Sequence, residues 1–494
     1  MAPPVDVRKY YEGKTVFITG ATGFLGKVLV EKLLRSCPDV KRIYLLIRQK
    51  KNQSSAERLD AFISSKVFER LQKDSPKCFD KLRLVPGDIL AEKLGISSED
   101  EAELRRECQI FFHCAACVRF DMNIRDALNL NTLGTKRVLT LAKTMEKLEV
   151  FLHVSTAYSR CELSTLEEKL YPELHNPEKV LDCVTWMDDE LLNRLSSKLI
   201  EPQPNTYAYT KSLTESLVQR YAGDFPIAIA RPSIVTASYK EPVPGWVDNL
   251  NGATGLLVGA GKGVIRTMHC NEDYRADVIP VDFVVNGCLI LACLTALEKS
   301  KEVRVCNVTE SGVNPLTWGK ALAMGRKHVK DYPFSVCLWY PGGTIKKSRH
   351  HHEIAALFTH ALPAYLVDTL LLLLGQKPFL VNIQKRVSYG LEVLQYYTTK
   401  EWYFVNDNYL ALKNSVTEED NKIFYTDLKE VNWDLYIMNY IKGAREYCCK
   451  EDPSTLPQAR RLSKILFYAD WLLHIFSACI FLYFVYYCLC KIFI

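Results

Sequence analysis

Two side chains spaced four residues apart, Tyr207 and Lys211, are suited to exchanging a proton with a substrate oxygen. Residues at this spacing share one face of a helix. A lysine ammonium beside a phenol stabilises the phenolate, so we expect Lys211 to lower the pKa of Tyr207 from about 10 toward neutral pH. The pair lies about 50 residues after an apolar run that ends in two hydroxyl side chains, Ser155 and Thr156. A surface pair on an amphipathic helix is the alternative interpretation.

A glycine-rich turn near the start of the chain has the features of a dinucleotide site. It follows an apolar β-type run, Thr15 to Ile18, and precedes a helical pattern that contains Val28, Leu29, Leu33 and Leu34. Glycines at such a turn bring backbone N–H groups against a pyrophosphate, which the N-terminus of the following helix also attracts. An ordinary glycine turn at a strand end is the alternative. The residues expected to contact the cofactor are Gly20, Thr22, Gly23, Phe24, Leu25 and Gly26.

Residues at the ends of three further predicted strands extend this cofactor site. The run Arg42 to Ile47 ends at Arg48, where a protein that prefers NAD usually carries an acid. A basic residue suits a 2′-phosphate, so Arg48 predicts NADPH, and an exposed strand-end arginine is the alternative. Asp88 and Ile89 follow another strand and are candidates for binding adenine, while the small Ala115 would allow close approach to the cofactor.

The first half of the chain alternates between strand and helix patterns. From Lys14 to about Val235, short apolar runs are separated by helical periodicity, which predicts an α/β fold with a doubly wound parallel sheet. The predicted strands after the first are Arg42 to Ile47, Leu82 to Val85, Gln109 to His113, Val150 to Ser155 and Ile227 to Arg231.

The region after this sheet is rich in loops and is expected to cover the substrate. We place a tail at 1–13, a reductase domain at 14–350, and a substrate lid within it at about 236–350, where Gly259 to Gly263 is predicted to form turns. Basic residues near these glycines either bind substrate phosphates or pair with surface acids. They are Lys262, Arg266 and Arg275.

The last part of the chain is predicted to be helical, with a mainly helical domain at 351–450. Tyr365 to Leu374 is too short to span a bilayer and is expected to be a buried helix or one wall of an acyl channel. Trp471 to Cys490 is long enough, about 30 Å at 1.5 Å per residue, so we predict a transmembrane tail anchor within 466–490. Basic residues before it predict a cytosolic main body. A buried, interfacial or hairpin helix is the alternative.

Composition bounds these interpretations. The chain has 494 residues, of which 48% are hydrophobic and 24% charged, so it can bury more than one core. The net charge of +6 is too small over this length to predict a nucleic-acid partner. Seventeen scattered cysteines are typical of reduced cytosolic thiols, and the lone Cys114-x-x-Cys117 pair does not predict a metal site. His350 to His352 is expected to lie in a solvated basic turn.

Taken together, these motifs resemble the extended short-chain dehydrogenase/reductases, and within them the alcohol-forming, male-sterility-type fatty acyl-CoA reductases of animals. The resemblance covers nearly the whole chain. Cys117 departs from it, because relatives usually carry a small hydroxyl residue there. The segments that carry the resemblance, besides the glycine turn and Tyr207-x-x-x-Lys211, are Phe112 to Asp121, His153 to Tyr158, Pro204 to Tyr207, Arg231 to Val235, Glu241 to Gly252, Gly259 to His269, Glu401 to Phe404 and Asn406 to Asn408.

The resemblance implies a Rossmann domain that reduces a long-chain acyl-CoA to a primary alcohol with two NADPH, through a thiohemiacetal and an aldehyde. It implies that Thr156 or Ser155, with the Tyr207 hydroxyl, stabilises the oxyanion, and that Thr156 is the better candidate. Tyr207 would then protonate the aldehyde oxygen while Lys211 supports its charge. The remaining residues implied are Asn131, which would help to organise the site and its proton relay, and Arg231 and Pro232, which would flank the nicotinamide.

The same resemblance implies a role in lipid biosynthesis, with the alcohol serving as a wax, ether-lipid or pheromone precursor. A lipid membrane is the expected partner, with the endoplasmic reticulum favoured over the peroxisome. Two rival functions stay open, a membrane-bound steroid or sterol dehydrogenase and a non-catalytic lipid-binding scaffold. Chain-length preference, release of the aldehyde and oligomeric state are left open as well.

Overall fold

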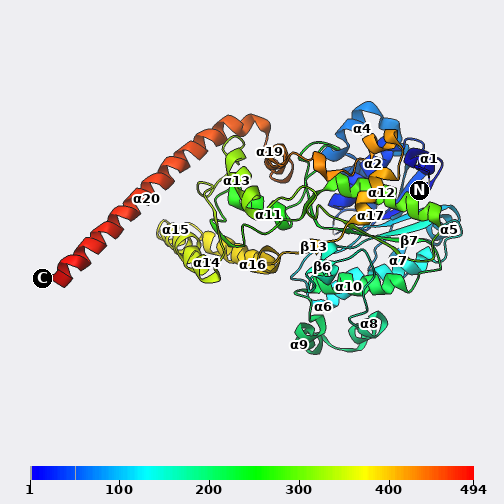
Figure 1. Ribbon diagram of the computed structural model, residues 1–494, viewed down its shortest axis with the longest axis horizontal. Helices are drawn as coiled ribbons and strands as arrows, with labels where there is room; N and C mark the ends of the chain where they lie inside the picture. Colours follow the sequence, from blue (N-terminus) through cyan, green and yellow to red (C-terminus); the bar gives the residue numbers. More distant parts are fainter. Residues whose placement is uncertain (1–2, 51, 494) are drawn as a thin grey trace. The chain divides into compact units, whose positions relative to one another are not determined.

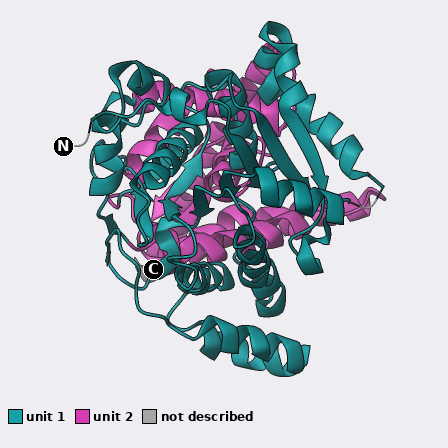
Figure 2. Cartoon of the chain, turned by 90° about the vertical axis from the view of Figure 1, so that its right-hand side faces the viewer, with its two compact units in different colours: residues 1–246, 275–316, 401–431 teal, residues 247–274, 317–400, 432–494 magenta. Residues whose placement is uncertain are grey.

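The computed structural model describes residues 3–50 and 52–493 (Figure 1). These residues form two compact units, coloured separately in Figure 2. Unit 1 comprises residues 1–246, 275–316 and 401–431, and unit 2 comprises residues 247–274, 317–400 and 432–494. The units cut across the predicted boundaries, because the expected lid contributes to both and 401–431 belongs to the sheet unit. Compactness depends on contacts between distant segments, which sequence order does not show.

Unit 1 is built on a seven-stranded parallel sheet with the strand order β11-β7-β5-β4-β1-β2-β3. The predicted doubly wound α/β fold is confirmed, and each strand predicted there is present within one residue at each end. The strands are β1 (Thr15–Thr19), β2 (Arg42–Ile47), β3 (Leu82–Pro86), β4 (Ile110–His113), β5 (Val150–Val154), β7 (Ile227–Pro232) and β11 (Arg304–Val308). β11 lies in the region predicted to be loop-rich.

Aromatic side chains fill the centre of this sheet. The Phe111 ring centroid lies 4.6 Å from that of Phe17 and 5.0 Å from that of Phe151, and all three side chains are fully buried. The register aligns Thr19 with His113 and His113 with His153, so β1, β4 and β5 end at one edge of the sheet. In parallel α/β sheets, ligands bind at this carboxyl edge.

The main helices packed with the sheet in unit 1 are α2 (Phe24–Ser36), α7 (Gly134–Ala142), α10 (Thr206–Gln219) and α12 (Val281–Glu298). α12 is apolar enough to cross a membrane by composition, but it is largely buried and belongs to the core. The other helices of unit 1 are α1 (Val7–Tyr11), α3 (Ser55–Ile63), α4 (Glu69–Asp74), α5 (Ser98–Glu107), α6 (Ile124–Ala127), α8 (Pro177–Trp186), α9 (Asp189–Ile200), α17 (Asp407–Ala411) and α18 (Glu418–Ile423). Its two-stranded pairs join β8 (Ile234–Thr236) to β10 (Val278–Pro280) and β6 (Thr165–Leu166) to β13 (Tyr403–Phe404).

Unit 2 is mainly helical, as predicted for the C-terminal region. Its only sheet among the described residues is the pair β9 (Thr267–His269) and β12 (Thr344–Lys346). The long helix α20 (Leu456–Phe493) contains the predicted anchor and is exposed throughout its apolar part. The other helices are α11 (Gly252–Gly261), α13 (Trp318–His328), α14 (Arg349–Ala356), α15 (Leu362–Leu373), α16 (Leu380–Thr398) and α19 (Trp433–Gly443).

Several local predictions were wrong. Residues 7–11 of the expected tail form α1, which buries Val7 and Tyr11 and whose first N–H donates to Asp420 at 2.5 Å. α11 continues to Gly261, where turns were expected, and the three histidines from His350 lie in α14 and not in a turn. The leucine run in α15 is exposed and not buried. The conformation or burial of each of these segments depends on tertiary contacts, which the sequence does not show.

Candidate active site

The glycine turn after β1 has the geometry that a pyrophosphate requires. Gly20 adopts a left-handed backbone with φ +74°, and a Cβ there would lie 2.6 Å from the Ala115 backbone nitrogen. A Cβ on Gly26 would lie 2.3 Å from the Gly20 carbonyl oxygen. Gly23 caps α2 without any side-chain hydrogen bond, which leaves the helix N-terminus open to an anion. These residues fit a dinucleotide, and the backbone of Ala115 lies against the turn, while its approach to the cofactor stays a prediction.

Two arginines lie at the edge of this turn, and sequence reasoning found one of them. Arg58, on α3, donates from Nη2 to Thr22 Oγ1 at 3.2 Å and from Nη1 to the Arg48 carbonyl oxygen. Arg48 Nη1 lies 3.9 Å from Asp88 Oδ2. Burial, followed by repulsion from Arg48, lowers the pKa of Arg58. Arg58 belongs to no motif; its place in the first turn after the capping box of Ser54 was the available signal.

Three other predicted cofactor residues have side chains that pack, wholly or in part, against the rest of the protein. The Phe24 ring stacks on Trp246 with centroids 5.3 Å apart. Ile89 belongs to the hydrophobic core, and its carbonyl oxygen accepts a hydrogen bond from Arg137 Nη1 at 3.1 Å. Leu25 is half-buried. We therefore expect these residues to contribute backbone atoms or surface shape to the site and no polar side-chain contact.

The proposed catalytic residues meet where β5 ends against α10. Asn205 caps α10 by accepting from Ala208 N at 2.9 Å, which places Tyr207 in the first turn and Lys211 one turn later. The Tyr207 phenol faces the Thr156 side chain, which acts to lower the pKa of the phenol. Lys211 Nζ donates to the Val154 carbonyl oxygen at 2.7 Å. The arrangement brings a phenol, a hydroxyl and an ammonium together at the carboxyl edge of the sheet.

The expected depression of the tyrosine pKa is not observed. Desolvation raises the pKa of Tyr207 to about 12, while the hydrogen bond with Thr156 acts in the opposite direction. Desolvation lowers the pKa of Lys211 to about 8, against an opposing effect of Glu215. The Lys211 ammonium is directed at a backbone carbonyl, so burial dominates the phenol. Tyr207 therefore keeps its proton at neutral pH, which suits a proton donor.

Two predicted site residues are held instead in a buried network around Glu215. Ser155 Oγ donates to Glu215 Oε1 at 2.5 Å, and Arg231 donates to the same carboxylate from Nε at 2.9 Å and from Nη2 at 2.5 Å. Arg231 is fully buried and also donates to the carbonyl oxygens of Glu167 and Lys169.

This network bears on the predictions for Ser155 and Arg231. Ser155 is not a free oxyanion donor, which leaves Thr156 as the hydroxyl beside Tyr207. The nitrogens of the Arg231 side chain all donate to protein groups, and Pro232 ends β7; the position of these two residues beside the nicotinamide stays a prediction. Glu215 was missed by sequence reasoning, although it lies four residues after Lys211 on the same helix.

Asn131 connects the strand ends to α10. It lies in a π-helical turn (Leu128–Leu133), a geometry that is frequent at functional sites. Its Oδ1 accepts from Cys117 N at 2.8 Å, and its Nδ2 donates to Thr210 Oγ1 at 3.0 Å. Asn131 thus fixes the loop after β4 against the helix that carries Tyr207.

The three basic residues proposed for substrate phosphates are all paired with acids. Within unit 2, Arg266 lies 2.9 Å from Asp470, and Lys262 lies 3.8 Å from Glu451. Within unit 1, Arg275 lies 3.2 Å from Glu401. The alternative interpretation, pairing with acids, is what the structure contains.

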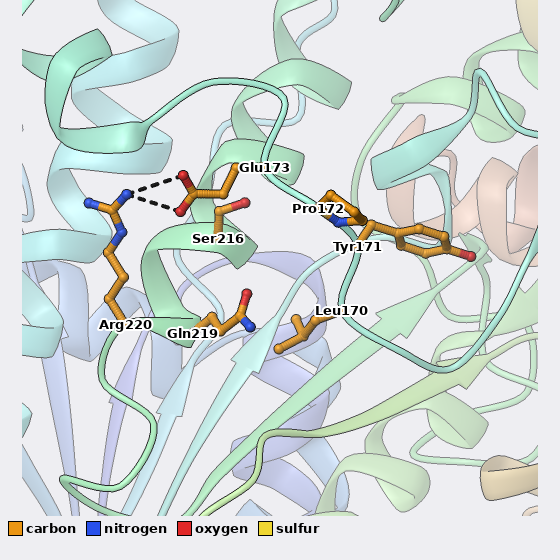
Figure 3. A pocket seen from close by; sticks show the side chains of 7 residues that line it. All are labelled: Leu170, Tyr171, Pro172, Glu173, Ser216, Gln219 and Arg220. Carbon is orange, nitrogen blue, oxygen red and sulfur yellow. Dashed lines mark hydrogen bonds and ion pairs between the residues drawn. The ribbon is translucent and has the colours of Figure 1, made fainter.

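A pocket of about 440 Å³ opens beside the C-terminal part of α10 (Figure 3). Arg220 and Glu173 form an ion pair at 3.0 Å on one side of it, and Leu170, Tyr171 and Pro172 form the other. The residues that line it include none of the proposed catalytic residues, so this pocket is separate from the candidate active site.

Known proteins share this architecture. A solved reductase domain of a non-ribosomal peptide synthetase from Mycobacterium tuberculosis superposes with a TM-score of 0.59 and 20% identity, covering 88% of this chain and 94% of that one. The terminal reductase domain of the myxalamid biosynthetic pathway gives a TM-score of 0.57 and 20% identity, covering 89% and 92%. At this identity the likeness concerns the fold alone.

Sequence comparisons reach further. Two family models, both described as male sterility protein, match residues 18–288, the NAD-binding part, and residues 359–451. The chain is 41% identical to human and rat fatty acyl-CoA reductase 1, covering 92% of this chain and 89% of each relative. It is 38% identical to mouse fatty acyl-CoA reductase 2, covering 92% and 88%. The chain therefore belongs to the male sterility protein family, the family of the fatty acyl-CoA reductases.

Proposed function

We propose that this nicotinamide-dependent oxidoreductase reduces a long-chain fatty acyl-CoA to a primary alcohol, consuming two NADPH. The observation that carries the proposal is the placement of Tyr207 against Thr156, with Lys211 one helical turn further along α10, in a chain of this family. A carbonyl oxygen placed against these two hydroxyl groups would receive two hydrogen bonds as its negative charge develops.

NADPH, when bound, would supply the hydride for each reduction. In the first, Thr156 and Tyr207 stabilise the oxyanion of the thioester carbon, and departure of CoA as a thiolate from the thiohemiacetal leaves an aldehyde. In the second, Tyr207 donates its proton to the aldehyde oxygen. The raised pKa of Tyr207 keeps that proton available, and the nearby Lys211 ammonium stabilises the phenolate that results.

The preference for NADPH is supported by two cations at the turn. Arg58 contacts both Thr22 and the Arg48 carbonyl oxygen, and a 2′-phosphate at this edge would neutralise the repulsion between the two arginines. The glycine turn would hold the pyrophosphate. Asp88, which lies near Arg48, would keep that guanidinium oriented when no phosphate is present.

We further propose that α20 anchors the protein in the membrane of the endoplasmic reticulum, with both units in the cytosol. Its apolar part begins after Asp470 and is exposed, whereas the turns before it carry Arg460, Arg461 and Lys464. This placement suits the chemistry, because the acyl chain and the alcohol partition into lipid while CoA and NADPH stay in water.

The test measures NADPH oxidation by the membrane-bound protein with saturated acyl-CoAs of increasing chain length, followed by extraction of products. About two NADPH consumed per alcohol formed, and little oxidation of NADH, is the expected result. Tyr207→Phe should abolish most of the turnover. Oxidation of a sterol with NAD and no turnover of any acyl-CoA would overturn the proposal in favour of a steroid dehydrogenase, and full activity of Tyr207→Phe would overturn the mechanism.

A further inference from the structure

The helical hairpin α14 to α16 of unit 2 exposes an apolar stripe that runs the length of α14 and α15. A π-helical turn (Leu357–Ala361) joins these two helices into one rod. Its large apolar residues recur at every fourth position and are between 43% and 75% exposed. The stripe consists of Ile354, Phe358, Leu362, Leu366, Leu370 and Leu374. An exposed apolar surface of this extent is unusual unless it contacts a partner or a membrane.

The opposite side of the rod is the side that contacts protein, and it is small or polar. His360, Ala364 and Asp368, also four residues apart, are all buried. His360 Nε2 accepts from the Arg266 backbone N–H at 2.8 Å, and Asp368 accepts from the Leu380 and Val381 N–H groups that begin α16. A helix on the surface of a soluble protein has the reverse arrangement, with its apolar face inward.

The charges around the stripe are mostly positive. Lys377 lies in the turn between α15 and α16, and Lys385 and Arg386 lie on α16; all three are exposed. Between residues 349 and 386 the acids are Glu353 and Asp368, and Asp368 is buried under the start of α16. A leucine-rich face flanked by cations is the pattern of helices that lie in the surface of an anionic membrane.

One residue of unit 2, Arg266, contacts both the rod that carries the stripe and the helix of the proposed anchor. The backbone N–H of Arg266 donates to His360 in the rod, while its guanidinium pairs with Asp470 at 2.9 Å. Trp339 Nε1 donates to the same carboxylate, which lies at the last turn of α20 before its exposed apolar part. When α20 enters a bilayer, the rod is therefore held close to the membrane surface.

We propose that the apolar stripe of α14 and α15 inserts shallowly into the bilayer that α20 crosses, as a second and separate lipid contact. The rod is long and apolar enough to cross a membrane by length and composition, but α16 returns beside it with Lys385 and Arg386 exposed and would have to enter the hydrocarbon with it. Shallow insertion avoids burying these charges. This inference rests on the proposed anchoring by α20, and the experiment below distinguishes the two.

The test places a photoactivatable benzophenone amino acid at single positions of the full-length protein, reconstituted in phosphatidylcholine vesicles that contain phosphatidylserine and an alkyne-labelled lipid. Leu366 and Leu370 report on the stripe, and Phe481 reports on α20. Val336 is the matched control, because it is 73% exposed but lies far from the proposed membrane surface. Its neighbour Ser335 contacts Thr455, which directly precedes α20 and lies roughly 20 Å along the helix axis from Asp470.

We expect strong lipid crosslinking at Leu366, Leu370 and Phe481 and little at Val336. Lipid crosslinks at Phe481 alone would overturn the stripe proposal and leave the anchor intact. Crosslinks from Leu366 to a second copy or another protein would overturn it as well. Absence of lipid at Phe481 would overturn the anchor, whatever the stripe positions give. Leu366→Asp should reduce the lipid yield at Leu370 several-fold, while the same substitution at Leu195, an exposed helical leucine of unit 1, should leave it unchanged.

Discussion

The ion pair between Glu215 and Arg231 makes a sharp prediction, because it is buried and tied to the strand that carries the proposed catalytic hydroxyl. Arg231 is fully buried and the Glu215 side chain is 6% exposed, so replacing either one with methionine leaves the other as an uncompensated buried charge. Breaking a buried pair in this way costs about 3–5 kcal/mol. Glu215→Met also removes the acceptor of the Ser155 hydroxyl, which adds about 1 kcal/mol.

For a unit of this size, such a loss corresponds to a fall in melting temperature on the order of 10 °C. The double variant Glu215→Met/Arg231→Met removes both charges and should fall by clearly less than the sum of the single variants, since apolar residues often replace a buried pair at little cost. Thermal unfolding of the purified protein, followed by intrinsic fluorescence in one detergent at one concentration, measures the three values.

The control is the pair of Glu173 and Arg220 beside the pocket in Figure 3, whose side chains are 37% and 31% exposed. Exposed pairs contribute about 0–1 kcal/mol, so Glu173→Met should change the melting temperature by no more than ~3 °C. Additive losses in the double variant of the buried pair, or losses no larger than that of the control, would refute the reasoning.

Three further predictions concern the proposed active site. Thr156→Ala should lower kcat about 10²–10³-fold. Ser155→Ala removes a hydroxyl that donates to Glu215, so it should lower the melting temperature and change kcat little. Equal losses of kcat in the two variants would contradict the assignment. Arg48→Ala and Arg58→Ala should each raise the KM for NADPH about tenfold with little change for NADH, and a parallel rise for both cofactors would count against a 2′-phosphate site. Because the pKa of Lys211 is lowered to about 8 and the proposed role needs its ammonium, activity should fall as the pH rises through about 8; a rate that stays flat to pH 10 would exclude that role.

Local patterns in the sequence determined the Rossmann half of the protein. The strands of the sheet are continuous apolar runs, because a parallel sheet is buried on both faces, and such runs can be read without knowledge of the fold. The glycine turn could also be predicted from the sequence, because its geometry requires glycine. The left-handed backbone at Gly20 and the close approach of Ala115 leave no room for a side chain. Tyr207 and Lys211 are one helical turn apart, so their position on a common face could be predicted from the helix alone.

The tertiary structure decided what depends on neighbours distant in sequence. The phenol of Tyr207 has a raised pKa because burial outweighs Lys211, and the desolvation of a group cannot be obtained from its spacing. Ser155 and Thr156 are adjacent in sequence, yet only their surroundings separate them, since Glu215 takes one hydroxyl and Tyr207 the other. The leucines of α15 form the same pattern whether a helix faces a core, a channel or a lipid. Packing alone shows that this rod buries Asp368 and leaves Leu366 exposed.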